Sequence, residues 1–255
     1  MDEKRTVFQS IKNVPETSWK KLGEKRIYFG HQSVGNNIVD GIRDAMKANP
    51  QIKLNIVETN NSADFSVPLF AHSQIGKNED PKSKCEAFVR LMERGMGDSV
   101  DIALLKFCFV DVTGKTDVDR LLADYGSTIN ALKKRYPNVT YVHITVPLMT
   151  VQTGPKVWLK KLIGRPIGGY EDNIRREEYN RKLRSEYGRK DPLFDLAALE
   201  STFPDGRRYT FSAGGKAHEA LVHEYTDDGG HLNQKGRQWV GEQFLVFLAN
   251  LSTKE

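Results

Sequence analysis

Cysteine is scarce in this 255-residue chain, and long apolar runs are absent from it. Cys85 and Cys108 form no CxxC pair, so two buried free thiols are expected before a disulfide, and a metal site is least expected. No run approaches the ~20 apolar residues of a membrane-spanning helix, so no integral membrane segment is predicted. The opening residues MDEKRTVFQS lack the apolar core of a signal peptide. A periplasmic or secreted protein that has lost its signal and a cytoplasmic protein both stay open.

The chain also has no large excess of charge of one sign. The 38 Lys and Arg residues oppose 33 Asp and Glu, which leaves a net charge of +5. Basic residues gather only at 156–165 and 175–190, and neither stretch carries a nucleic-acid-binding motif. We therefore expect a solvated surface and no nucleic-acid partner, while an anionic substrate stays compatible with the charge. Hydrophobic residues make up 38% and charged residues 28%, which is typical of a globular protein.

Short apolar runs alternate with amphipathic helical patterns along most of the chain. This alternation predicts an α/β fold, with a parallel sheet, right-handed crossovers and helices on both faces. In such sheets the ligand lies at the carboxyl ends of the strands. The expected strands are 26–29, 52–57, 100–109, 139–146 and 193–196, and the expected helices are 33–48, 82–94, 116–136, 173–187 and 233–251.

The length fits one large domain, which we place at 25–255 after an N-terminal lead-in at 1–24. Residues 59–81 show no clear period and are expected to form a long functional loop. Residues 147–172 lose order again and are interpreted as a lid or an insertion. The region after the last expected strand, as far as residue 225, is expected to be irregular.

The stretch KRIYFGHQSVG at 25–35 places a serine at a strand-to-helix turn. An apolar run ends at Gly30, and Ser33 opens a helical pattern. Such a turn exposes the hydroxyl beside the free N–H groups of a helix start, which suits a nucleophile. The alternative is that Ser33 is only the N-cap of the helix. A base elsewhere in the chain would favour the nucleophile.

A candidate base comes near the other end of the chain, in the sequence Asp228-Gly229-Gly230-His231. An aspartate three residues before a histidine can fold back onto the imidazole and fix its tautomer. The other ring nitrogen is then free to act as a general base. The alternative is an ordinary turn followed by an exposed histidine.

Together, the early Gly-x-x-Ser turn and the DGGH-Leu-Asn sequence before the last helix resemble the SGNH (GDSL-type) hydrolase superfamily. The resemblance covers residues 26–251 and implies a flavodoxin-like three-layer α/β/α sandwich. It implies Ser33 as the nucleophile, with Asp228 and His231 as the acid–base pair, and no cofactor or metal. The reaction it implies is hydrolysis of short acyl esters, such as acetyl groups on a carbohydrate or a small molecule, by an esterase or deacetylase through an acyl-enzyme.

Two other functions stay open beside this one. An O-acyltransferase would use the same residues and pass the acyl group to an alcohol. A non-catalytic domain of the same fold would bind a carbohydrate or another partner.

The sequence departs from the superfamily pattern at the oxyanion hole. The usual Gly-Asp-Ser is here Gly30-His31-Gln32-Ser33, and the third block, Gly-x-Asn-Asp, has no asparagine in Lys106–Asp111. The resemblance implies the N–H groups of Ser33 and Gly76 as oxyanion donors. The missing donor is replaced by Asn78, by Lys106 or by nothing.

Several polar residues have a structural alternative beside a functional one. His31 and Gln32 either bind substrate or only form structural hydrogen bonds. Lys106, within an apolar strand, needs a carboxylate partner such as Asp111 or points into the site. Cys108 is not expected to be a second nucleophile, since no base is identified near it.

Two sets of residues along the chain are expected to have no catalytic or metal-binding role. His72 and His143 match no metal-ligand spacing with His31, so no metal site is predicted. One helix face is expected to be solvated, and it carries Asn173, Arg176 and Asn180.

Overall fold

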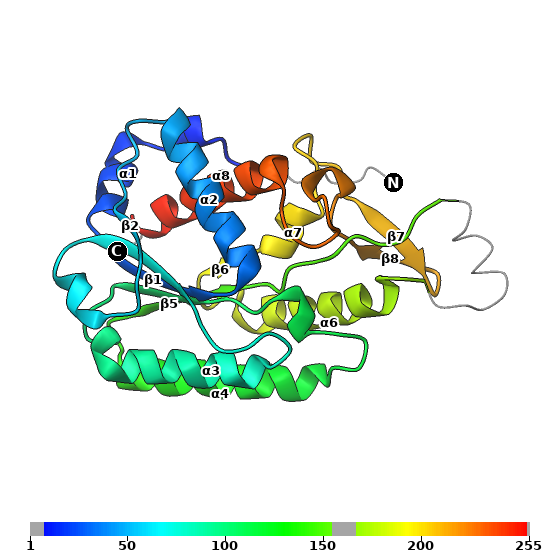
Figure 1. Cartoon of the computed structure of the whole chain (residues 1–255), viewed down its shortest axis with the longest axis horizontal. Coiled ribbons are helices and arrows are strands. Elements are labelled where there is room, and N and C mark those ends of the chain that lie inside the picture. Colours follow the sequence, from blue (N-terminus) through cyan, green and yellow to red (C-terminus); the bar gives the residue numbers. More distant parts are fainter. Residues whose placement is uncertain (1–7, 155–166, 254–255) are drawn as a thin grey trace.

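The computed structural model describes residues 8–154 and 167–253. In this part of the chain, parallel strands form a central sheet in the order β2-β3-β1-β4-β5-β6, with helices on both faces (Figure 1). The strands are β1 (Arg26–His31), β2 (Ile56–Glu58), β3 (Leu69–Gln74), β4 (Ile102–Leu105), β5 (Thr140–Ile144) and β6 (Leu193–Phe194). The predicted three-layer α/β/α sandwich is confirmed. Without the edge strand β2, the strand order is the flavodoxin-like one.

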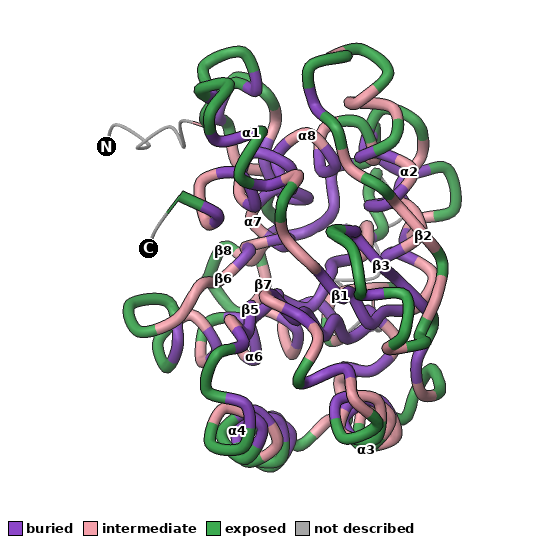
Figure 2. Tube along the Cα trace, turned by 90° about the vertical axis from the view of Figure 1, so that its left-hand side faces the viewer, coloured by how far each residue is buried: buried purple, intermediate pink, exposed green. Residues whose placement is uncertain are grey.

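The helices form two layers, one on each face of the sheet. The first layer contains α1 (Glu16–Gly23), α2 (Ser33–Ala48), α7 (Leu196–Glu200) and α8 (Gln234–Leu251), and the second contains α3 (Pro81–Leu91), α4 (Val118–Arg135) and α6 (Tyr170–Tyr187). Short helical turns lie at Ile11–Asn13, Ser62–Ser66, Met92–Met96, Phe109–Asp111 and His223–Tyr225. Figure 2 shows the buried chain concentrated between the layers. Each large apolar side chain buried there stabilises the fold by roughly 1.5–3 kcal/mol.

Helices α2 and α8 cross at a very short distance. A Cβ atom on Gly41 would lie 1.9 Å from the carbonyl oxygen of Arg237, and one on Gly241 would lie 2.3 Å from the backbone of Gly41. Any larger side chain at these positions would push the helices apart. The guanidinium of Arg237 also donates to Asp44 at 3.0 Å. These contacts fix the two helices relative to each other, and both helices begin at the same edge of the sheet.

The prediction of a long loop at 59–81 is wrong, because this segment contains the interior strand β3. This strand pairs with β1 on one side and with β2 on the other. Its sequence hides it, since His72 and Ser73 are polar and yet buried. The hydroxyl groups of Ser73 and Tyr28 are 2.7 Å apart, and this hydrogen bond satisfies a polar group inside the core. The expected strand at 52–57 is correspondingly shorter and shifted to Ile56–Glu58.

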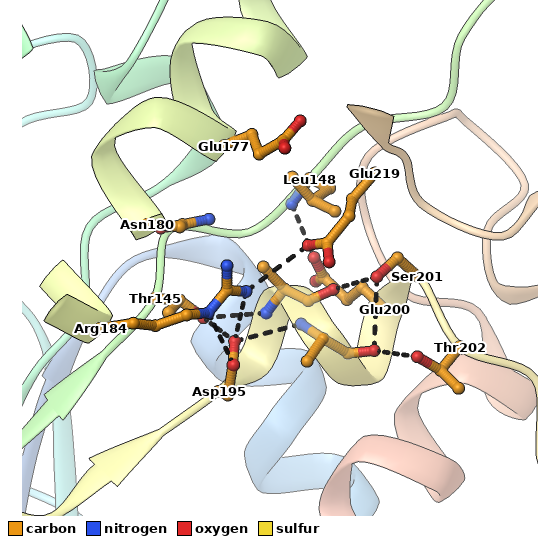
Figure 3. A network of polar contacts seen from close by, with 12 residues as sticks. Thr145, Leu148, Glu177, Asn180, Arg184, Asp195, Glu200, Ser201, Thr202 and Glu219 are labelled. Atoms are coloured by element: carbon orange, nitrogen blue, oxygen red, sulfur yellow. Dashed lines mark hydrogen bonds and ion pairs between the residues drawn. The ribbon is translucent and has the colours of Figure 1, made fainter. Parts of the chain in front are cut away.

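The region after β6 is also more ordered than expected. It contains α7 and an antiparallel hairpin of β7 (Thr210–Ala213) and β8 (Lys216–Glu219). Figure 3 shows how Arg184 of α6 ties these parts together. Its guanidinium makes two hydrogen bonds to Asp195, at 2.7 and 2.8 Å, and one to Glu219 of the hairpin at 3.5 Å.

Much of the segment interpreted as a lid, residues 155–166 of 147–172, lies outside the described residues. The described part of the segment begins at Pro147, and Met149 is held against α6 by Asn173. Among the described helices, none is both long and apolar enough to cross a bilayer.

Candidate active site

The site lies at the carboxyl edge of the sheet, where two distant segments meet. Strand β1 ends at His31, and α2 begins at Ser33 immediately after it. The second segment is the turn before α8, which carries Asp228 and His231. The serine and the histidine are 198 residues apart in sequence. The parallel sheet and the α2–α8 crossing bring them together.

The three side chains form a connected hydrogen-bonded row. The Oγ atom of Ser33 lies 2.9 Å from Nε2 of His231, and Nδ1 of His231 lies 2.6 Å from Oδ2 of Asp228. A carboxylate only accepts, so it assigns the ring proton to Nδ1. The free lone pair on Nε2 then accepts the hydroxyl proton of Ser33. Ser33 is half-buried, while the side chains of His231 and Asp228 are 41% and 58% exposed, so the row opens to solvent.

Asp228 is held as an anion by the turn that contains it. Its Oδ1 atom accepts the N–H groups of Gly230 at 2.9 Å and of His231 at 2.8 Å, and the Thr226 hydroxyl at 3.2 Å. Partial burial acts to raise the pKa of Asp228, but the hydrogen bonds from Gly230 and His231 outweigh it and lower the pKa well below its usual value. The carboxylate is therefore ionised at any pH at which the histidine can act as a base.

Ser33 does not cap its helix. The N-cap residue of α2 is Gln32, and Ser33 is the first residue of the helix proper. Its hydroxyl contacts His231 and, at 3.8 Å, the sulfur of Cys108. The N-cap alternative is therefore wrong, and the hydroxyl has no helix-capping duty.

His31 is entirely buried and contacts the protein on all sides. Its Nδ1 atom donates to the carbonyl oxygen of Gln32 at 2.9 Å, and its Nε2 atom lies 3.1 Å from Nδ1 of His72. Its ring fills the space where residue 35 would carry a Cβ atom, which would lie 2.1 Å away. Gly35 therefore has to be glycine, and His31 has no exposed surface to offer to a ligand.

Gln32 holds the chain that follows β3. Its side-chain amide donates to the carbonyl oxygens of Ile75 at 2.9 Å and of Gly76 at 3.0 Å. Gly76 has φ +61°, and a Cβ atom there would lie 2.6 Å from the backbone of Lys84. The glutamine thus anchors the Gly76 turn beside the start of α2.

Removing this anchor is expected to destabilise the protein. In Gln32→Ala both hydrogen bonds are lost, so we expect the free energy of unfolding to fall by about 1–3 kcal/mol. Chemical denaturation measures the change. Gln74→Ala is the matched control, because Gln74 is exposed at the end of β3. Equal stability of the two variants would contradict a role for the Gln32 amide.

Asp111 is paired with Lys84, and not with Lys106 as the sequence suggested. Both side chains of the Lys84–Asp111 ion pair are completely buried. The same carboxylate accepts the N–H groups of Cys108 at 2.6 Å and of Glu79 at 3.0 Å, while Lys84 also donates to Asn78 at 3.1 Å. The pair therefore joins the Gly76–Asn78 turn to the end of β4.

Lys106 and Cys108 follow β4, because the expected strand 100–109 already ends at Leu105. Both side chains are buried, and Cys85 and Cys108 are free thiols, as expected. The ammonium of Lys106 donates to the carbonyl oxygen of Phe107 at 3.1 Å and lies 3.8 Å from the sulfur of Cys108. The amino group of Lys106 therefore lies near Cys108, where the sequence identified no base.

The expected solvated face of α6 is wrong as well. Its polar residues are buried and hold the chain that follows β5. Asn180 exchanges two hydrogen bonds with the backbone of Val146, and Asn173 exchanges two with that of Met149. Arg176 donates to the carbonyl oxygens of Phe109 at 2.9 Å and Val112 at 3.0 Å. These side chains replace the neighbouring strand that this segment lacks.

The buried histidines predict that acid destabilises the protein. Burial lowers the pKa of His31 to about 3 and of His143 to about 4, from an ordinary value of 6.5. Both groups therefore contribute stability that is complete above pH 6.5 and is lost as the pH falls toward 4. The expected slope is about 1.4 kcal/mol per pH unit for each histidine.

Urea denaturation between pH 7 and pH 4 measures this slope. His143→Phe keeps a ring to stack on Tyr187, which lies 3.9 Å from the His143 ring, and removes one titrating histidine. The buried His72, whose pKa burial also lowers, stays in place, so the variant should lose only the contribution of His143, about 1.4 kcal/mol per pH unit. A slope that it leaves unchanged would refute the prediction.

Two contributors to the site were missed at the level of sequence. Lys84 lies four residues before Phe88 on the buried face of α3, and this spacing was the available signal. Asn37 lies one turn after Ser33 and accepts the N–H of Leu232 at 3.1 Å, which ties α2 to the segment of His231. Nothing local in the sequence indicates that second contact.

Comparisons with solved structures agree on the fold. A protein from Streptococcus pneumonia, described as a candidate platelet activating factor, is 12% identical, with a TM-score of 0.51 over 93% of this chain and 94% of its own. A protein from Desulfitobacterium hafniense DCB-2 assigned to the lipolytic G-D-S-L family is 7% identical, with a TM-score of 0.50 over 88% and 99%. A candidate GDSL-like lipase from Parabacteroides merdae is 13% identical, with a TM-score of 0.50 over 88% and 95%.

No protein-family model and no curated protein sequence matches this chain. At these identities the likeness is one of fold. The fold that the resemblance to the SGNH (GDSL-type) superfamily implies is confirmed.

Proposed function

We propose that this protein is a serine ester hydrolase that acts through an acyl-enzyme. The observation that carries the proposal is the row from Ser33 through His231 to Asp228, with distances of 2.9 and 2.6 Å. The names of two structural neighbours, a lipolytic G-D-S-L protein and a GDSL-like lipase, are consistent with it.

In the proposed reaction, Nε2 of His231 takes the hydroxyl proton as Ser33 attacks the ester carbonyl. Asp228 keeps the ring in the required tautomer and stabilises the imidazolium. The imidazolium then protonates the leaving alcohol. A water molecule, deprotonated by the same nitrogen, releases the acid from Ser33.

The oxyanion is proposed to bind backbone N–H groups. Among the described residues, neither the N–H of Ser33 nor that of Gly76 has a hydrogen-bond acceptor. Gln32 accounts for the fixed position of Gly76. The Oδ1 atom of Asn78 accepts from Lys84, which leaves its amide protons as a further candidate donor. In a comparable hole one donor contributes on the order of 10²–10³ in rate.

Short acyl esters of a bulky alcohol, such as acetylated carbohydrate, are the proposed substrates. The exposure of His231 and Asp228 leaves the leaving-group side open to a large alcohol. The cavity of about 770 Å³ between α3 and α4 is lined by neither Ser33 nor His231. The acyl group is proposed to be short, as the resemblance to the SGNH superfamily implies.

Covalent labelling tests the proposal. A fluorophosphonate probe is expected to modify Ser33, with the mass located on the peptide that contains it. His231→Ala should label far more slowly, because the serine then lacks its base. Labelling of another residue at the same rate would refute Ser33 as the nucleophile.

Product analysis with an added sugar acceptor separates hydrolysis from acyl transfer. Free acid as the sole product supports the hydrolase, whereas an acylated acceptor identifies a transferase with the same three residues. A protein that is inert toward the probe but binds glycan saturably would be a binding domain.

A further inference from the structure

A second set of contacts leads from Ser33 to two buried residues that follow β4. The sulfur of Cys108 lies 3.8 Å from the Oγ atom of Ser33 and 3.8 Å from the Nζ atom of Lys106. Both side chains are fully buried. Cys108 is held from its backbone, whose N–H donates to Asp111 at 2.6 Å. The thiol is thus fixed between a buried amino group and the hydroxyl of the serine.

The direction of each contact follows from what the groups can donate. The Nζ atom of Lys106 donates to the sulfur of Cys108. The hydroxyl proton of Ser33 is directed to His231, which leaves the oxygen as an acceptor toward the thiol. The protons therefore all point one way, from Lys106 through Cys108 and Ser33 to His231.

Stability alone gives no reason for a lysine at this position. No carboxylate of the described residues lies within 4.0 Å of the Lys106 ammonium. Glu200 is a nearby acid, but burial raises its pKa to about 8, so it is largely protonated at neutral pH. A buried amino group without a paired carboxylate is destabilising, and burial lowers the pKa of Lys106 from its ordinary value. Groups that are unfavourable for the fold are expected where function requires them.

We propose that Cys108 is a further catalytic residue and that Lys106 is a positioning residue behind it. The thiol donates to the Ser33 oxygen and fixes the hydroxyl in the rotamer that faces His231. The buried amino group of Lys106, which donates to the sulfur, favours the negative charge that develops as the serine proton leaves. No bond to sulfur forms: the thiol keeps its proton, the serine proton moves to His231, and the oxygen electron pair attacks the carbonyl carbon.

This inference rests on the proposed ester hydrolysis. It also places a hydrogen-bond donor in the region of the chain where the superfamily has the asparagine of its third sequence block. Cys108 follows β4, at the carboxyl edge where that block would provide its donor. The contact is made to the nucleophile itself, so it supplements the proposed backbone donors and does not replace them.

The decisive variant is Lys106→Met, which keeps the length of the side chain and removes its amino group. We expect kcat to fall about 10- to 100-fold while the midpoint of urea unfolding stays equal or rises, because a buried amino group without a paired carboxylate is gone. Activity and stability then move in opposite directions, which a structural role cannot produce. Lys106→Gln provides the same comparison if the first variant does not fold.

Cys108→Ala is expected to lower kcat about 3- to 10-fold with little change in KM. Cys85→Ala is its matched control, because Cys85 is the other buried free thiol and lies on α3. It should leave kcat unchanged.

Wild-type kcat in both Lys106→Met and Cys108→Ala would overturn the inference, and so would losses that follow a loss of stability. If the unsubstituted protein hydrolyses esters and labels at Ser33, such a result leaves the proposed function intact. If the unsubstituted protein does neither, the proposed function and this inference fall together.

Discussion

Replacing Ser33 by alanine is expected to reduce hydrolysis of a short-chain nitrophenyl ester by a factor of about 10⁴–10⁶. The substitution removes the oxygen that forms the acyl-enzyme, so only non-covalent effects of the site remain. The fold should be unaffected, because the hydroxyl caps no helix and, among the described residues, hydrogen-bonds to His231 and Cys108 alone. Steady-state rates together with a thermal melt of the same preparation measure both effects.

A matched serine elsewhere controls for the substitution itself. Ser127 is exposed on α4, in the opposite helical layer, so Ser127→Ala should retain full activity. A Ser33→Ala protein with the wild-type rate would rule out Ser33 as the nucleophile. A protein that loses activity together with its thermal transition would leave the loss attributable to misfolding, in which case Ser33→Gly provides the comparison.

Asp228→Asn is expected to lower kcat by about 10⁴ with little effect on stability. The carboxylate accepts the proton on Nδ1 of His231 at 2.6 Å and so keeps Nε2 free. An asparagine can turn its amide N–H groups toward Nδ1. The ring then carries its proton on Nε2, where it cannot accept the proton of Ser33.

The same substitution at the adjacent Asp227 serves as a control. Asp227 accepts the side-chain amide of Asn233 at 3.0 Å and makes no contact with the His231 ring. Asp227→Asn preserves that acceptor and should change kcat by less than about twofold. Equal losses in the two variants would indicate a general charge effect and would contradict the assigned tautomer.

The architecture could be predicted from sequence because it depends on the order of elements. Alternating strands and helices require a parallel sheet, and a parallel sheet collects the ends of its strands at one edge. That reasoning placed the Ser33 turn at this edge, whereas His231 was assigned to the same site by the resemblance to the SGNH superfamily. It failed for β3, whose buried His72 and Ser73 make a central strand look like a polar loop.

Side-chain partners were less predictable, since several residues compete for each one. Asp111 lies five residues after Lys106, yet it pairs with Lys84 from another element. The polar face of α6 could not be told from a solvated one, because its asparagines satisfy backbone groups of a distant segment. In both cases the partners meet only after the layers pack.

The stretch KRIYFGHQSVG shows which features the sequence determines and which depend on the tertiary structure. By itself, the sequence determined a strand, a turn and a helix beginning near Ser33, because apolar periodicity and local turn chemistry are encoded in neighbouring residues. The tertiary structure decided that His31 packs against Gly35, that Gln32 anchors Gly76, and that the hydroxyl faces His231. Those contacts depend on the α2–α8 crossing and on β3 lying beside β1, which no local pattern specifies.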